Sequence, residues 1–140
     1  MSFTNTISPR LPLVTDTKFG YAMFATVAQS VSQNLKCLLL TAPGERVMNP
    51  DFGVGLKKYL FQNYSPETVK NMKIDIRQQV QKYMPFISIT EANVKFGDNL
   101  AENQDSKSQN KMFVSISYVI QSIGISDVLN VSISLESIQQ

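Results

Sequence analysis

The sequence LLLTAPGERVMNPDFGVGLKKYLF, from Leu38 to Phe61, decides how the rest of the chain is arranged. It starts as the end of an apolar helix, is interrupted from Pro43 to Gly53, and returns to a helical pattern at Leu56. Four of the chain's twelve proline and glycine residues lie in that interruption. Because proline and glycine are the strongest interruptions of secondary structure, their density predicts a fixed connection between two helices.

Apolar residues at helical spacing predict a helix on each side of this connection. The first helix is expected to begin near Asp16 or Thr17, either of which can cap it, and to end before Pro43. Its predicted buried face carries apolar residues at three- and four-residue steps, namely Phe24, Val27, Val31, Leu35 and Leu38. A short second helix is predicted from Leu56 to Phe61, and its expected inward residues are Leu56, Leu60 and Phe61.

The third helix has the clearest start signal in the chain. Ser65 is placed to cap it, Pro66 occupies the first helical position, and Glu67 lies in the first turn, where the helix dipole favours an acidic residue. Pro85 marks its end. The predicted buried stripe is Val69, Met72, Ile76, Val80 and Tyr83, whereas Asp75 is assigned to the solvent-facing side.

Three strands with alternating apolar and polar residues are predicted after this helix, at Ile87–Phe96, Met112–Gln121 and Leu129–Leu135. In the first strand the apolar positions change parity, which predicts a β-bulge or a break near Thr90. The polar run Gly97–Asn110 is predicted to be a long mobile hairpin loop between the first two strands.

These elements predict an α+β fold, with three helices packed on one face of a small, mainly antiparallel three-stranded sheet. Residues 1–18 are expected to form an extended N-terminal arm, and residues 19–140 a single domain. Two interpretations of the arm stay open: a disordered terminus, or an arm that becomes ordered on a neighbouring subunit. The apolar residues that could anchor it there are Phe3, Ile7, Leu11, Leu13 and Val14.

The composition excludes several classes of chemistry. The chain has no histidine, so serine–histidine and cysteine–histidine catalysis and imidazole ligation of zinc are not available. Its single cysteine, Cys37, cannot form an intramolecular disulfide or a cysteine metal cluster. The net charge of +2 does not predict nucleic-acid binding, and no apolar run approaches the ~20 residues of a membrane span. We therefore expect no cofactor, no metal site, no nucleic acid and no membrane partner.

The stretch around the predicted connection resembles the small baseplate wedge protein of contractile-tailed phages. This family includes the related component of type VI secretion baseplates and is sometimes labelled lysozyme-like. The resemblance extends over roughly residues 20–135, and its pattern is a Gly-Glu-Arg run, then Asn-Pro-Asp-Phe-Gly, then Leu-Phe. The matching residues are Leu40, Thr41, Gly44, Glu45, Arg46, Pro50, Phe52, Gly53, Leu60 and Phe61.

The resemblance implies a structural role in a virion, at the tail baseplate, with assembly in the host cytoplasm. It implies that the protein docks on larger baseplate wedge proteins and templates polymerisation of the tail sheath protein by strand pairing. Tail tube and hub proteins are further partner candidates. Within the last strand, an edge that could accept another chain, the residues expected to serve partner binding are Val131 and Ile133. The resemblance does not decide between a phage tail and another contractile injection system.

Four more residues are expected to bind partners. Arg46 and Phe52 lie in the connection, although Arg46 could instead hold groups within its own turn. Many relatives carry Glu-Pro-Arg just after the third helix, whereas this chain has Met84-Pro85-Phe86. If relatives dock there through charge, this protein is expected to dock through apolar contact by Met84 and Phe86, unless those side chains belong to the core.

The lysozyme-like label suggests an alternative function, that of a peptidoglycan-cleaving enzyme. Glycoside hydrolysis needs two carboxyl groups ~5–9.5 Å apart, one with a raised pKa. The candidates are Glu45, Asp51, Glu67, Asp75 and Glu91, and the sequence marks no pair among them. We therefore predict no catalytic residue and no enzymatic activity.

Overall fold

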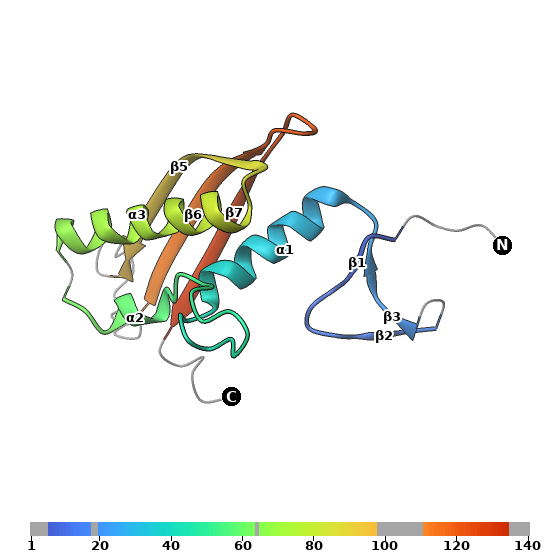
Figure 1. Ribbon diagram of the computed structural model, residues 1–140, viewed down its shortest axis with the longest axis horizontal. Coiled ribbons are helices and arrows are strands. Elements are labelled where there is room, and N and C mark those ends of the chain that lie inside the picture. Colours follow the sequence, from blue (N-terminus) through green and yellow to red (C-terminus); the bar gives the residue numbers. More distant parts are fainter. Residues whose placement is uncertain (1–5, 18–19, 64, 98–110, 135–140) are drawn as a thin grey trace.

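A computed structural model describes residues 6–17, 20–63, 65–97 and 111–134 of the chain. The fold is α+β, as the sequence predicts: helices lie against one three-stranded sheet, and the N-terminal segment stands to one side of it (Figure 1). In chain order the elements are β1 (Ser8–Pro9), β2 (Thr15–Asp16), β3 (Gly20–Tyr21), β4 (Met23–Phe24), α1 (Val27–Leu40), α2 (Lys57–Leu60), α3 (Pro66–Tyr83), β5 (Ile87–Phe96), β6 (Lys111–Ile120) and β7 (Ile125–Ser134).

The main sheet is antiparallel with strand order β5-β6-β7, so β5 and β7 are its two edges. The register between β5 and β6 shifts between Ile89 and Glu91, which confirms the irregularity predicted near Thr90. Beyond the shift, apolar residues pair across all three strands on the face toward the helices. One such row is Val94, Val114 and Val131.

Two helices cover this face of the sheet. Helix α1 contacts β7, α3 contacts β5, and the two helices contact each other (Figure 1). Helix α2 is a single turn of four residues. The predicted arrangement of three helices on the sheet is therefore not confirmed as such, because only α1 and α3 are long enough to present an apolar face to it. Burial of that face forms the core, with Leu35 and Leu39 from α1 and Met72 and Ile76 from α3 fully enclosed.

The start signal of the third helix is confirmed. The backbone of Ser65 is extended and its hydroxyl accepts the Thr68 N–H at 3.1 Å, while Pro66 takes the first helical position. This hydroxyl satisfies one of the N–H groups that every helix start leaves unpaired. The helix ends at Tyr83, just before Pro85.

The predicted start of the first helix is wrong. Helix α1 begins at Val27, about ten residues after Asp16 and Thr17. Two short antiparallel ladders lie before the helix instead, one pairing β1 with β4 and the other β2 with β3. Gly20, at φ +80°, has a left-handed backbone that a helix cannot include, and the pairing of β2 with β3 replaces helical hydrogen bonds. Phe24 lies in β4, outside the helix.

The inward face of the short helix is partly mispredicted. Leu56 is fully buried, but Phe61 is 70% exposed, and the aromatic residue that α2 buries is Tyr59. A single turn aims only part of its circumference at the core, and Phe61 follows that turn. Three expectations concern residues outside the described part of the chain: the anchor Phe3, the strand end Leu135 and the loop beyond Gly97.

In the described residues, no helix combines the length and the apolar character that crossing a membrane requires. The division of the chain at residue 18 stays a prediction.

Candidate partner-binding site

The segment between α1 and α2, residues 41–56, is the connector, and its backbone closes the end of α1. The N–H groups of Val54 and Leu56 donate to the carbonyl oxygens of Leu38 and Leu39, at 3.0 and 3.1 Å. A helix leaves its last carbonyl groups unpaired, and buried ones must find donors elsewhere. The connector supplies these donors, which fixes its path against the helix it follows.

Two glycines allow this close approach. Gly53 has φ +108°, and a Cβ atom placed there would lie 2.1 Å from the carbonyl oxygen of Thr41. Gly55 has φ +65°, and its N–H donates to the same oxygen at 2.9 Å. Any other residue at position 53 would meet both a strained backbone and a clash with main-chain atoms. The glycine of the Asp-Phe-Gly run is therefore a packing requirement of the connector.

The Gly-Glu-Arg turn is closed by its own hydrogen bonds. The Gly44 N–H donates to the Pro50 carbonyl oxygen at 2.7 Å, and the Ala42 N–H donates to Glu45 Oε2 at 2.9 Å. Glu45 thus caps the turn in which it lies. Between these ends the loop turns outward, so that the side chains of Val47 and Met48 are 94% and 96% exposed.

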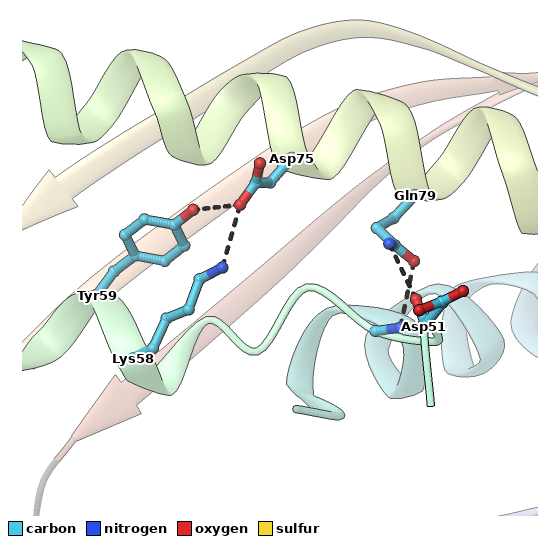
Figure 2. A network of polar contacts seen from close by, with 6 residues as sticks. Asp51, Lys58, Tyr59, Asp75 and Gln79 are labelled. Atoms are coloured by element: carbon cyan, nitrogen blue, oxygen red, sulfur yellow. Dashed lines mark hydrogen bonds and ion pairs between the residues drawn. The ribbon is translucent and has the colours of Figure 1, made fainter. Parts of the chain in front are cut away.

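One stripe of α3 holds the other side of the connector (Figure 2). The Gln79 amide bridges two connector residues, since its Oε1 accepts the Gly53 N–H at 3.2 Å and its Nε2 donates to the Asp51 carbonyl oxygen at 3.1 Å. One turn further on, the Tyr83 hydroxyl donates to Asn49 Oδ1 at 3.1 Å. Residues four apart on a helix share a face, so α3 grips the connector at successive turns.

Asp75, one turn before Gln79, continues this stripe and holds α2 (Figure 2). Its Oδ2 accepts the Tyr59 hydroxyl at 2.6 Å and pairs with Lys58 Nζ at 3.1 Å. Burial acts to raise the pKa of Asp75, but the hydrogen bonds from Tyr59 and Lys58 and the charge of Lys58 outweigh it, so the pKa is lowered. Burial, with the nearby Asp75, raises the pKa of Tyr59. The pair therefore stays in its hydrogen-bonded form, with an ionised carboxylate and a neutral phenol.

The rings of Phe52 and Tyr83 form an aromatic wall where the connector meets the end of α3. The Arg46 guanidinium carbon lies 4.1 Å from the centre of the Phe52 ring, and that ring meets Tyr83 edge-on with centroids 4.9 Å apart. A cation over an aromatic face is attracted by the ring's electrons. The wall borders a cavity of about 300 Å³ whose lining also includes Cys37 and Met84.

Four of the residues predicted to bind partners come together at this cavity: Arg46, Phe52, Met84 and Phe86. They differ in exposure, because Met84 is 6% exposed and belongs to the core, whereas Phe86 is 40% exposed. The difference in exposure between Met84 and Phe86 follows from the way α3 ends. The Met84 N–H still donates to the Val80 carbonyl oxygen, which keeps that side chain on the core side, while Phe86 lies beyond Pro85. A partner can reach Phe86 directly, but not Met84.

The other two predicted residues, Val131 and Ile133, lie on β7 and do not line this cavity. Their side chains are 3% and 2% exposed and face the core. Only their main-chain groups could serve a partner strand. From Ile125 to Ile133, within the described chain, the one strand paired with β7 is β6.

Sequence reasoning missed the stripe of α3 that holds the connector. The sequence pattern predicts that Asp75 faces solvent and that Tyr83 is buried, and it predicts no role for Gln79. A signal was present, because the three residues stand at four-residue steps and each can accept or donate a hydrogen bond. What the spacing could not reveal is that a loop, and not water, lies opposite them.

The chain resembles known proteins both in sequence and in fold. The family model described as "Baseplate wedge protein gp25" matches residues 25–124. The baseplate wedge protein gp25 of Enterobacteria phage T4 is 32% identical over 66 residues, which cover 47% of this chain and 50% of that protein. The match therefore spans about half the length of the T4 protein.

Two solved structures share the fold. A Geobacter sulfurreducens protein whose structure bears the name tail lysozyme superposes with a TM-score of 0.66 at 19% identity, covering 81% of this chain and 96% of that one. A chain of the anti-feeding prophage baseplate superposes with a TM-score of 0.64 at 22% identity, covering 79% of this chain and 82% of that one. At such identities the likeness concerns the fold alone.

Proposed function

Because the chain belongs to the baseplate wedge protein gp25 family, we propose that it docks on larger wedge proteins in a contractile-tail baseplate and templates the tail sheath by strand pairing. The family is one of structural tail components, and the partners that follow from it are other baseplate proteins. The finer roles rest on two surfaces of the molecule, the connector cavity and the outer edge of β7.

The edge of β7 carries the templating proposal. It keeps an unbroken register with β6 over ten residues, and Asp127 is its only charged residue. The opposite edge differs: β5 has a register shift between Ile89 and Glu91, and it carries two charged residues, Glu91 and Lys95. Bulges and charged side chains are the features that keep edges from pairing. The sheet thus blocks one edge and leaves the other regular, as a template for an added strand requires.

The connector cavity supports the docking proposal. It offers an exposed phenyl ring, Phe86, beside an aromatic wall and the charged Arg46. Aromatic residues, phenylalanine among them, and arginine are enriched in protein interfaces. Arg46 makes no ion pair with any described residue, and its guanidinium N–H groups remain available for a partner.

We also propose that the protein is not a glycosidase. Three of the candidate carboxyl groups have structural duties: Glu45 caps its turn, Asp51 pairs with Lys82 at 3.8 Å, and Asp75 holds α2. The pKa of Asp75 is lowered, whereas a general acid needs a raised pKa. Zymography of the purified protein is expected to give no clearing. Clearing that a single carboxylate substitution abolishes would overturn this proposal.

The templating role is tested by placing a lysine on each edge of the sheet. Ser132→Lys adds a charge to the exposed side of β7, and Asn93→Lys adds the same charge to the exposed side of β5. Particles carrying Ser132→Lys are expected to assemble baseplates whose tails lack sheath in electron micrographs. Asn93→Lys should leave sheath formation unchanged. Normal sheath with both variants, or equal loss with both, contradicts templating by β7.

A further inference from the structure

Two adjoining cavities lie between the N-terminal segment and α1. The first has a volume of about 460 Å³ and reaches β7 at Asp127, and the second has a volume of about 380 Å³ and reaches the connector at Glu45. Leu11, Gln33 and Lys36 border both cavities. The two cavities therefore lie side by side along α1, and we call them together the arm groove.

Three polar contacts join the outer wall of the arm groove to α1. The Leu11 N–H donates to Gln33 Oε1 at 2.7 Å, and Gln33 Nε2 donates to the Pro9 carbonyl oxygen at 3.2 Å. The hydroxyl groups of Ser8 and Ser30 lie 2.9 Å apart. The apolar side chain of Leu11 is 51% exposed at the rim. Gln33 thus sets the width of the groove, and an apolar residue remains open on its border.

The basic side chains that line the groove outnumber its acidic ones. Arg10, Lys36 and Lys57 line it, and none of them forms an ion pair with a described residue. The two carboxylates on its lining are already engaged, since Glu45 accepts the Ala42 N–H and Asp127 accepts two donors.

The donors to Asp127 come from its own sheet. The Val128 N–H donates to Asp127 Oδ1 at 2.8 Å, and the Tyr118 hydroxyl donates to Oδ2 at 3.1 Å. Burial is the main cause that raises the pKa of Tyr118 to about 12, so this hydroxyl keeps its proton. Asp127 is therefore held by the sheet, and its charge remains because both donors are neutral. With three basic and two acidic side chains, the lining of the groove keeps a net positive charge.

We propose that the arm groove binds an extended acidic segment of another protein chain. The lining runs along α1 from Gln29 to Thr41, about 18 Å at the helical rise, which an extended segment of about six residues spans. Carboxylates of that segment face Arg10, Lys36 and Lys57, and an apolar side chain packs on Leu11. This surface is separate from the connector cavity and does not depend on the proposed templating role.

The test uses the full chain and two fluorescein-labelled peptides of about eight residues. In the first, glutamate alternates with leucine and serine; in the second, glutamine replaces each glutamate. Anisotropy titrations at low salt are expected to show the acidic peptide binding at least about tenfold more tightly than the glutamine peptide. The difference should shrink at about 0.3 M salt, because ions screen exposed charges.

Three variants locate the binding. Lys36→Glu reverses the charge shared by both cavities and is expected to weaken acidic-peptide binding about tenfold or more. Lys70→Glu reverses an exposed charge on α3, outside the groove, and should leave binding unchanged. Gln33→Ala alters no charge but frees the arm, and is expected to weaken binding of the acidic peptide as well. Thermal melts followed by circular dichroism establish that each variant is folded.

Several outcomes would overturn the proposal. Equal affinity for the two peptides, no binding of the acidic peptide, or equal loss in Lys36→Glu and Lys70→Glu each contradict a basic groove for an acidic segment. Sedimentation tests one further outcome. If the protein forms a salt-sensitive dimer that Lys36→Glu dissociates, the groove binds a second copy of this chain and the proposal is overturned. None of these results bears on the sheath assay, so the two proposals can fail separately.

Discussion

At the scale of single residues, the connector depends on a few residues that make close, specific contacts. Gly53 approaches the Thr41 carbonyl oxygen more closely than any Cβ atom allows, and Asp75 joins α3 to α2 through two donors. Phe52 is packed between Arg46 and Tyr83. The residues that carry the family resemblance are thus, in large part, residues that hold the connector in shape.

The first prediction distinguishes two ways in which replacing a glycine lowers stability: an unfavourable backbone conformation and a steric clash. Gly53→Ala is expected to destabilise the protein by about 3 kcal/mol or more, because it adds a clash to an unfavourable φ. Gly44→Ala is the matched control: its φ is +87°, but nothing lies within 4 Å of the added Cβ. Its expected cost is about 1 kcal/mol. Urea unfolding measures both, and equal costs would mean that the Thr41 contact relaxes freely.

The second prediction concerns the pH dependence of the Asp75 contacts. A carboxyl group with a lowered pKa stabilises the fold above its unfolded value, and this contribution is lost as the pH falls through the folded value. The ordinary pKa is 3.8, and that of folded Asp75 is lower. Asp75→Asn should therefore lower the free energy of unfolding by about 1 kcal/mol at neutral pH. The difference from wild type should vanish when the pH falls below the pKa of folded Asp75.

Urea unfolding at a series of pH values measures this difference. Glu91→Gln, which removes an exposed carboxylate on the outer side of β5, controls for the general loss of a charge. A cost of Asp75→Asn that stays constant down to the most acidic folded sample would contradict the assignment.

At the scale of elements, α3 has two working faces. One face buries Met72, Ile76 and Val80 in the core, and the neighbouring stripe of Asp75, Gln79 and Tyr83 holds the connector and α2. The C-terminal end of the helix then separates a buried residue from an exposed one across Pro85. This separation gives the docking proposal a direct test.

The third prediction contrasts the two residues that flank Pro85. Met84→Ala removes a core side chain and is expected to cost about 2–3 kcal/mol of unfolding free energy. Phe86→Ala should cost about 0.5 kcal/mol or less, because its ring is 40% exposed. If Phe86 docks on a wedge partner, Phe86→Ala particles should lack complete baseplates although the protein itself is stable.

Circular dichroism melts and electron microscopy of the particles provide the two readouts. A stable Phe86→Ala protein that still assembles normal baseplates would remove Phe86 from the docking site. A large loss of stability on Phe86→Ala would instead assign the ring to the core.

At the scale of the whole molecule, one core joins α1, α3 and the sheet, and the N-terminal ladders stand beside it (Figure 1). The apolar residues of that segment remain about half exposed, with Ile7 at 47%, Leu13 at 58% and Val14 at 55%. Half-buried apolar side chains contribute little to stability by themselves. These side chains of the arm therefore add little to the core, and binding of a partner by the arm stays a proposal.

The fourth prediction tests the division of the chain at residue 18. Deletion of residues 1–18 removes the contacts of Ser8, Pro9 and Leu11 with α1. We expect a loss of about 1–2 kcal/mol and a single cooperative unfolding transition. Guanidinium unfolding followed by circular dichroism measures both. A truncated chain that fails to fold would place the arm inside the domain.

The sequence by itself determined the elements whose signals are local. The cap at Ser65, the strand Ile87–Phe96 with its irregularity near Thr90, and the family resemblance of the connector depend on neighbouring residues, whose chemistry is read along the chain. The resemblance also directed attention to Arg46, Phe52, Met84 and Phe86, but only the structure shows that these residues line one cavity.

Only the tertiary structure decided what depends on distant segments. Helix α1 begins later than the sequence predicts, because the residues before Ala25 pair as strands and not as a helix. Helical periodicity could not reveal this pairing, since it depends on hydrogen bonds between separate segments. The different burial of Met84 and Phe86, and the unmatched charges of the arm groove, follow from which surfaces face each other. Burial and charge pairing are properties of two surfaces in contact, and a single stretch of sequence contains only one of them.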